Sequence, residues 1–241
     1  QRQMCIRDRS TWAPALDEVG AVYITYYPDL AFPGAAETVG ALADLAVSMG
    51  VRRQVLLSGR NEEGAQAAEE RLKQSGADYT LVRCDFFNQN FSETFVEPVR
   101  HGVVALPGSN IREPFLDAED IADVVVAALG DERHVGQLYE LTGPRLMTLD
   151  EVALELESAV GRPIRYVPMS TDDFADALTA EGIPLEEARA FADLIAEVLD
   201  GRNSYLTDGV QQALGRPARD FSEFARTAAA NGAFDLEEVA A

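Results

Sequence analysis

The stretch QVLLSGRNEEGAQAAEERLKQSGADYTLVRC, residues 54–84, decides the fold. It opens and closes on continuous apolar runs, Gln54–Ser58 and Tyr79–Cys84, which predict strands buried on both faces. Between them, residues 62–75 have the length and pattern of a helix, and Gly76 supplies the stop signal. A strand, a helix and a second strand in this order predict two parallel strands joined by a crossover helix.

The same alternation continues outward in both directions from this stretch. Upstream, Ala21–Tyr26 reads as a strand and residues 34–49 as a helix. Downstream, strands are expected over 102–106 and 138–142, with a helix over 117–129 between them. Alternating strands and helices of these lengths predict an α/β fold with a doubly wound parallel sheet covered on both faces.

The C-terminal part is predicted to be mostly helical. Thr148 and Glu151 form a capping box that opens a helix ending before Gly161. A short extended piece over 165–168 precedes four expected helices, over residues 171–181, 184–199, 204–214 and 220–230. We therefore expect a sheet-containing domain over 10–145 and a small, mostly helical lobe over 146–241.

The first nine residues have a different character. Gln1–Arg9 (QRQMCIRDR) has neither the apolar region of a signal peptide nor the amphipathic stripe of a transit peptide. The string MCIRDR resembles the translation of a transposase sequencing adapter. We expect residues 1–9 to be a non-native tail and the native protein to begin upstream; the alternative is an ordinary disordered N-terminus.

Composition excludes several classes of partner. The chain has 241 residues with 41 acidic and 20 basic side chains, a formal net charge of −21. This charge argues against binding to nucleic-acid phosphates and to anionic membrane surfaces. No apolar run reaches the roughly 18 residues of a membrane-spanning helix. Two cysteines are too few to stabilise a chain of this size by disulfide bonds, which favours a reducing, cytoplasmic location.

Several common sites are missing from the sequence. It contains no G-x-G-x-x-G, and Ala65-Gln66 stands where a P-loop requires Lys-Ser/Thr. His101 and His134 have no neighbours at metal-ligand spacing, so no metal site is expected. Cys84 ends an apolar strand and is interpreted as a small buried hydrophobe rather than a nucleophile.

Polar and aromatic residues follow three of the predicted strands. The segments are Thr25-Tyr26-Tyr27-Pro28, Ser58-Gly59-Arg60 and Arg83 to Asn90 (RCDFFNQN). The carboxyl ends of parallel strands meet at one edge of a sheet, where α/β proteins bind ligands. The three segments together predict a ligand site at this edge. The alternative is that their aromatic side chains simply pack against helices.

At these segments the sequence resembles the NmrA-like group of atypical short-chain dehydrogenases/reductases. The resemblance extends over about residues 12–232. The motifs that carry it are VLLS from Val55, GADYTLVR from Gly76, FNQNF from Phe87, EPFLDAEDIA from Glu113 and YELTGP from Tyr139. It implies an NAD(P)-binding Rossmann domain, with NADP or NAD as cofactor. It also implies that the chain enters the fold at the helix before the fourth strand, without the phosphate-binding turn.

Carried over by position, the resemblance assigns two sets of site residues. Those expected to bind the cofactor are Thr25, Tyr26, Pro28, Ser58 and Gly59. Those expected to shape the nicotinamide and substrate pocket are Phe86, Phe87 and Asn90. No catalytic residue is assigned. The Tyr-x-x-x-Lys pair of other short-chain dehydrogenases is absent, because Ala65 or Gln66 stands at the lysine position and no tyrosine precedes it.

The resemblance implies NAD(P)H-dependent hydride transfer to a small quinone-, azo- or dye-like aromatic acceptor. Such acceptors can take protons from water, so the absent Tyr/Lys pair weighs against alcohol–ketone chemistry but not against this reaction. The alternative is a non-catalytic NAD(P)-binding redox sensor that acts through protein partners. No nucleic-acid or membrane partner is expected, and a homodimer is left open.

Overall fold

The computed structural model describes residues 5–6, 8–27, 29–108 and 111–236, and its residues group into two compact units. Unit 1 consists of Gln1–Cys84, Glu119–Leu141 and Thr207–Pro217, and unit 2 of Asp85–Ala118, Thr142–Leu206 and Ala218–Ala241. Both units are discontinuous in sequence; the division into 10–145 and 146–241 stays a prediction. The expected non-native tail lies partly outside the described residues, at 1–4 and 7.

Unit 1 is built on a parallel sheet of four strands. In the order in which they pair, the strands are β1 (Ala21–Ile24), β2 (Arg53–Gly59), β3 (Asp78–Cys84) and β5 (Leu138–Glu140). At its centre Leu56 pairs with Ile24 of β1 and with Leu81 of β3, and all three side chains are buried. These are the continuous apolar runs of the sequence, and the parallel sheet that they predicted is confirmed.

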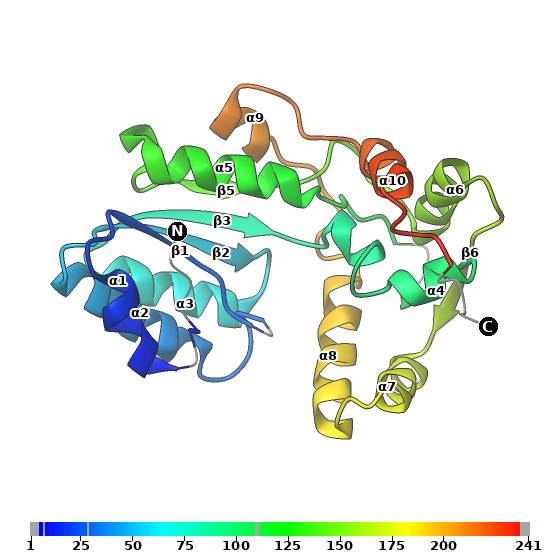
Figure 1. Ribbon diagram of the computed structural model, residues 1–241, viewed down its shortest axis with the longest axis horizontal. Helices are drawn as coiled ribbons and strands as arrows, with labels where there is room; N and C mark the ends of the chain where they lie inside the picture. The colour runs from blue at the N-terminus through cyan, green and yellow to red at the C-terminus, as the bar shows by residue number, and fades with distance from the viewer. Residues whose placement is uncertain (1–4, 7, 28, 109–110, 237–241) are drawn as a thin grey trace. The chain divides into compact units, whose positions relative to one another are not determined.

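Helices cover both faces of this sheet (Figure 1). Helices α2 (Ala35–Ser48) and α3 (Glu63–Gln74) lie on one face, and α5 (Ala118–Gly130) lies on the other. The shorter elements of unit 1 are η1 (Arg9–Thr11), α1 (Trp12–Leu16), η3 (Glu132–His134) and α9 (Gly209–Leu214). This arrangement confirms the doubly wound α/β fold class.

Helix α9 is shorter than predicted. The sequence predicted a helix over 204–214, whereas the observed helix begins at Gly209. The preceding segment is held against the end of β5, because the Thr207 hydroxyl donates a hydrogen bond to the Glu140 carbonyl. A Cβ at position 209 would come within 2.2 Å of that same carbonyl oxygen, so only glycine permits this approach.

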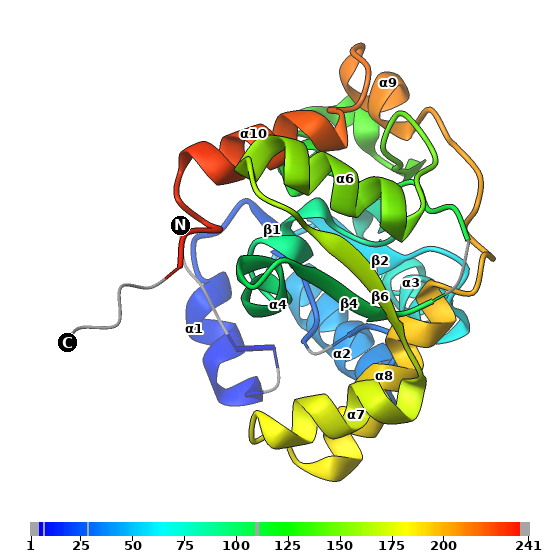
Figure 2. The same ribbon diagram turned by 90° about the vertical axis from the view of Figure 1, so that its right-hand side faces the viewer.

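Unit 2 contains a second, two-stranded parallel sheet. Strand β4 (Val103–Pro107) pairs with β6 (Arg165–Met169), as Figure 2 shows. Its helices are η2 (Asn88–Phe91), α4 (Val96–Arg100), α6 (Leu149–Val160), α7 (Thr171–Ala180), α8 (Leu185–Val198) and α10 (Phe221–Ala230). The predicted capping box is confirmed: Glu151 N donates to Thr148 Oγ1 at 3.1 Å, and Thr148 N donates to Glu151 Oε2 at 2.8 Å.

The core of unit 2 is rich in phenylalanine. Phe86, Phe91, Phe115 and Phe221 are all buried, and their neighbouring ring centroids lie 5.5–6.1 Å apart in tilted and edge-to-face geometries. Aromatic pairs in such geometries stabilise a core beyond the area they bury. The residues come from segments that are far apart in sequence, so the cluster joins the segments of unit 2.

An ion-pair network fixes the start of α10. Arg145 Nε donates to Asp220 Oδ2 at 2.7 Å, and its Nη2 donates to Glu155 Oε1 at 2.7 Å. Asp220 is also the N-cap of α10, because its Oδ1 accepts a hydrogen bond from Ser222 N at 2.9 Å. The hydrogen bond from Arg145, with a smaller contribution from Ser222, holds the pKa of the Asp220 carboxyl well below its usual range.

This depressed pKa predicts acid sensitivity. A carboxyl whose pKa is lowered by folding stabilises the native state above its unfolded pKa of about 4, and the stabilisation is lost as the pH falls toward the native pKa. Asp220→Asn keeps an N-cap side chain and removes the charge that pairs with Arg145, so we expect it to lower the free energy of unfolding by about 1 kcal/mol at pH 7. The difference from wild type should shrink below pH 4 in urea titrations at several pH values. A difference that stays constant from pH 7 to pH 3 would contradict this role.

Candidate functional site

The carboxyl ends of β2, β3 and β5 lie side by side in unit 1. The backbone N–H of Arg60, just beyond β2, donates to the Cys84 carbonyl at 2.9 Å. The N–H of Leu141, just beyond β5, donates to the Arg83 carbonyl at 2.8 Å. Because the strands are parallel, residues 58–60, 83–84 and 140 are brought to one edge. This edge is where a doubly wound sheet binds its ligands.

The segment after β1 is the most open part of this edge. Thr25 is exposed, Tyr26 is partly buried against the apolar core of unit 1, and 77% of Tyr27 is exposed. Pro28, the other residue assigned to cofactor binding here, lies outside the described residues. An exposed hydroxyl and an exposed aromatic ring at a strand end can contact a bound nucleotide by hydrogen bonding and stacking.

Ser58 is part of a buried polar network. Its hydroxyl donates to Glu69 Oε1 of α3 at 2.6 Å. Arg83 of β3 holds the same carboxylate in a bidentate ion pair, with Nε–Oε1 at 2.7 Å and Nη2–Oε2 at 2.6 Å. The Glu69 side chain is only 1% exposed. The network therefore ties α3 to the ends of β2 and β3, and it fixes the rotamer of Ser58.

The turn after β2 holds a second set of charges. The Arg60 side chain is fully buried, and its Nε donates to Glu140 Oε1 at 2.9 Å. A Cβ on Gly59 would come within 2.0 Å of Glu62 Oε2, so the Glu62 carboxylate lies directly against the glycine backbone. The carboxylate places negative charge beside Gly59, and a larger side chain at this position would displace the end of the Glu62 side chain.

In unit 2, the predicted substrate residues differ in their surroundings. Phe86 is buried in the aromatic core, where its ring contacts Phe91 and Phe115, so it packs against neighbouring rings as the structural alternative described. Phe87 and Asn90 are both partly exposed. Of the three, Phe87 and Asn90 are placed so that a ligand could contact them.

Sequence reasoning missed the buried acids and their arginine partners. Glu69 was not singled out, although it falls on the buried stripe of α3 with Ala65, Ala68 and Leu72. A carboxylate on an otherwise apolar helix face needs a partner, and this periodicity was the available signal. Arg60 carries no such signal, since its burial depends on the tertiary turn after β2.

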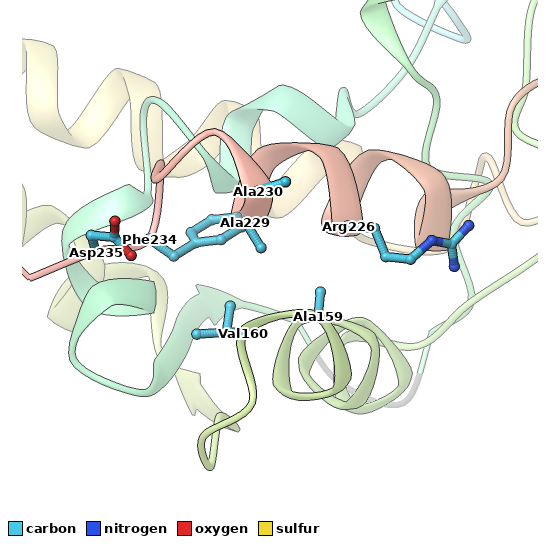
Figure 3. A pocket seen from close by; sticks show the side chains of 7 residues that line it. All are labelled: Ala159, Val160, Arg226, Ala229, Ala230, Phe234 and Asp235. Atoms are coloured by element: carbon cyan, nitrogen blue, oxygen red, sulfur yellow. The ribbon is translucent and has the colours of Figure 1, made fainter.

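Two surface hollows lie elsewhere, both in unit 2. One, between α6 and the end of α10, has a volume of about 270 Å³ and is lined mainly by small residues, with Phe234, Arg226 and Asp235 at its border (Figure 3). The other, of about 370 Å³, lies between α7 and α8 around Arg189. None of the predicted site residues lines either hollow.

Within the described part of the chain, helix α3 offers no tyrosine–lysine acid–base pair. Helix α3 has no tyrosine, and its lysine, Lys73, lies near its C-terminal end in an exposed ion pair with Glu70. No group of three or more His, Cys, Asp or Glu side chains could hold a metal ion among these residues. Nor is any described helix long and apolar enough to cross a bilayer.

Comparison with protein families matches residues 64–225 to the NmrA-like family. Over 235 residues the chain is 32% identical to an NAD(P)H azoreductase from Xenophilus azovorans, covering 93% of this chain and 81% of that protein.

Two solved structures share the fold. A triphenylmethane reductase from Citrobacter superposes with a TM-score of 0.79 at 16% identity, covering 95% of this chain and 83% of the other. An NADPH-dependent quinone oxidoreductase from Escherichia coli, complexed with NADPH, superposes with a TM-score of 0.78 at 23% identity, covering 94% and 82%.

Proposed function

The chain belongs to the NmrA-like family, and on this premise we propose that it is an NAD(P)H-dependent oxidoreductase of small quinone-, azo- or dye-like aromatics. The observation that carries the proposal is the similarity to an NAD(P)H azoreductase along 93% of the chain, including all the strand ends described above. The parallel sheet edge of unit 1 agrees with it, since doubly wound sheets bind dinucleotides at such edges.

The residues that would hold the cofactor are Thr25, Tyr26 and Pro28 after β1, and Ser58 and Gly59 at the end of β2. When bound, reduced NAD(P) supplies a hydride and leaves a cationic nicotinamide ring. The carboxylate of Glu62 against Gly59 suits a ring that becomes positive, and it would repel a phosphate at the same place. This charge favours the nicotinamide end of the cofactor at Gly59.

The acceptor would lie against the part of unit 2 that presents Phe87 and Asn90, with the buried Phe86 behind them. Transfer of one hydride and uptake of one proton convert a quinone to a hydroquinone. Water can supply that proton, so the reaction does not need the Tyr/Lys pair that α3 lacks. Catalysis would rest mainly on holding the two ring systems together in a productive orientation.

The test is oxidation of NADPH and NADH, followed at 340 nm, by the protein as its gene encodes it. The acceptors are a panel of benzoquinones, naphthoquinones, azo dyes and triphenylmethane dyes. We expect acceptor-dependent oxidation that saturates with at least one member of the panel. If the protein binds NAD(P)H but reduces no acceptor, the enzymatic proposal fails.

That last outcome would favour the second candidate function, a non-catalytic NAD(P)-binding sensor. The lack of a Tyr/Lys pair in α3 is the observation on its side. A sensor should discriminate between oxidised and reduced dinucleotide in equilibrium binding, without turnover. A protein that binds neither NADPH nor NADH would exclude both functions.

Two further features belong to the same proposal. The surplus of acidic residues makes a nucleic-acid partner unfavourable, and we place the protein in the cytoplasm, where its cofactor is reduced and abundant. A homodimer is the assembly we would test first. Light scattering of the purified protein gives the mass that decides between monomer and dimer.

A further inference from the structure

Three consecutive amides, Asn88, Gln89 and Asn90, follow the end of β3, and they lie in different surroundings. The Gln89 amide fixes the first residue of α5, because its Oε1 accepts from Ala118 N at 2.8 Å and its Nε2 donates to Asp117 Oδ1 at 2.7 Å. Asn90 is partly exposed. Asn88 is fully buried, at 0% exposure.

The Asn88 carboxamide has no hydrogen-bond partner among the described residues, at either Oδ1 or Nδ2. A buried polar group without a partner is costly, and native structures keep such a group only for a reason. Gln54 in unit 1 is equally buried and half satisfied: its Nε2 donates to the carbonyls of Ala43 and Val51, both at 3.2 Å, while its Oε1 has no partner among the described residues. In Asn88 neither side-chain polar atom is paired within the described part of the chain, so a ligand that reached this amide could satisfy both of them.

The surroundings of Asn88 indicate what its amide would bind. Its backbone N–H donates to the Leu116 carbonyl at 2.8 Å, which anchors the residue. It lies in sequence between Phe87 and the aromatic core residue Phe91, and its neighbours Phe87 and Asn90 are each partly exposed. An anchored, unpaired amide directly after the partly exposed Phe87 in the chain suits a planar conjugated ring with a polar substituent.

We propose that Asn88 recognises the carbonyl oxygen of a quinone-like acceptor, an assignment that rests on the proposed function. An amide can serve both forms of such a ligand. Its Nδ2–H donates to the carbonyl of the quinone, and its Oδ1 accepts from the hydroxyl of the hydroquinone product. A hydrocarbon side chain at this position could make neither bond, so Asn88 acts as a specificity-determining residue.

The test is Asn88→Leu, which keeps the side chain's shape and removes its polar atoms. In the protein as its gene encodes it, we expect KM for tetramethyl-1,4-benzoquinone to rise about tenfold or more, because a desolvated carbonyl loses its donor. KM for NAD(P)H should stay within twofold. If KM for NAD(P)H rises instead, the amide serves the nicotinamide carboxamide, and the assignment to the acceptor is overturned.

Thermal stability supplies a readout independent of turnover. Without ligand, Asn88→Leu should melt at the same temperature as wild type or about 2–4 °C higher, because a buried unpaired amide has been removed. The matched control Gln54→Leu, which removes an equally buried amide whose Nε2 donates to two backbone carbonyls, should melt lower. An Asn88→Leu protein that melts lower and has unchanged kinetic constants would show a purely structural residue and overturn the proposal.

Quinone binding separates this inference from the proposed function. The quinone should raise the melting temperature of wild type and leave that of Asn88→Leu unchanged. The quinone could raise the melting temperature of wild type but not of Asn88→Leu, while wild type oxidises no NAD(P)H. That result would rule out the proposed enzymatic function and support the assignment of Asn88. Equal stabilisation of both proteins by the quinone would refute the assignment whatever the activity.

Discussion

Glu69→Ala is expected to lower the free energy of unfolding by about 3–5 kcal/mol, the range for removing one partner of a buried ion pair. The substitution leaves the Arg83 guanidinium without its bidentate acceptor, and it removes the carboxylate oxygen that the buried Ser58 hydroxyl contacts at 2.6 Å. Equilibrium urea unfolding measures the loss. Because the network holds the ends of β2 and β3, the variant should also bind NAD(P)H more weakly.

The next residue on the same helix is the control. Glu70 pairs with Lys73 on the exposed face of α3, and surface ion pairs of this kind contribute little. Glu70→Ala should change the free energy of unfolding by no more than about 0.5 kcal/mol. Alanine favours a helix more than glutamate does, so helix propensity explains neither loss; equal losses in the two variants would show that the buried network contributes no more than a surface ion pair.

Phe91→Ala is expected to cost about 3–5 kcal/mol, the usual range for truncating a buried phenylalanine. Its ring is fully buried, and its centroid lies 5.5 Å from Phe86 and 5.7 Å from both Phe115 and Phe221. Truncation opens a cavity where three segments of unit 2 meet. The measurement is the midpoint and slope of urea unfolding.

Leu154 serves as the control for this second prediction. It lies on α6 of the same unit and is 60% exposed, so Leu154→Ala removes apolar atoms that are already in contact with water. Its expected cost is within about 0.5 kcal/mol. A loss for Phe91→Ala that is no larger would show that the aromatic cluster adds nothing to the stability of unit 2.

Much of unit 1 could be predicted from local patterns. Residues 54–84 alternate between apolar runs and an amphipathic helix, and strands β2 and β3 with helix α3 formed within one or two residues of the predicted bounds. The second sheet could not be predicted from the sequence. Residues 102–106 were predicted as a strand and 165–168 as a short extended piece, but no local pattern records that β4 and β6 pair with one another. That choice depends on tertiary packing.

The sequence predicted which strand ends meet better than it predicted their detail. The polar segments after β2 and β3 were expected at one edge of the sheet, and residues 58–60 and 83–84 do lie together there; that a ligand binds at this edge stays a prediction. In the run Asn88-Gln89-Asn90, however, the sequence shows three similar side chains, and only the backbone path decides which is buried, which caps a helix and which reaches solvent. The ion pair between Arg60 and Glu140 joins residues 80 positions apart, so no periodicity could reveal it.

The discontinuous make-up of the two units has a consequence for biosynthesis. Unit 1 needs Thr207–Pro217, and unit 2 needs the segment that begins at Ala218, so neither is complete until nearly all of these residues have been translated. Multidomain chains commonly fold one domain at a time from the N-terminus during synthesis. Here the apolar surface of the early strands stays exposed until the C-terminal segments that complete each unit have been synthesised. We expect nascent chains that stall before residue 207 to depend on chaperones.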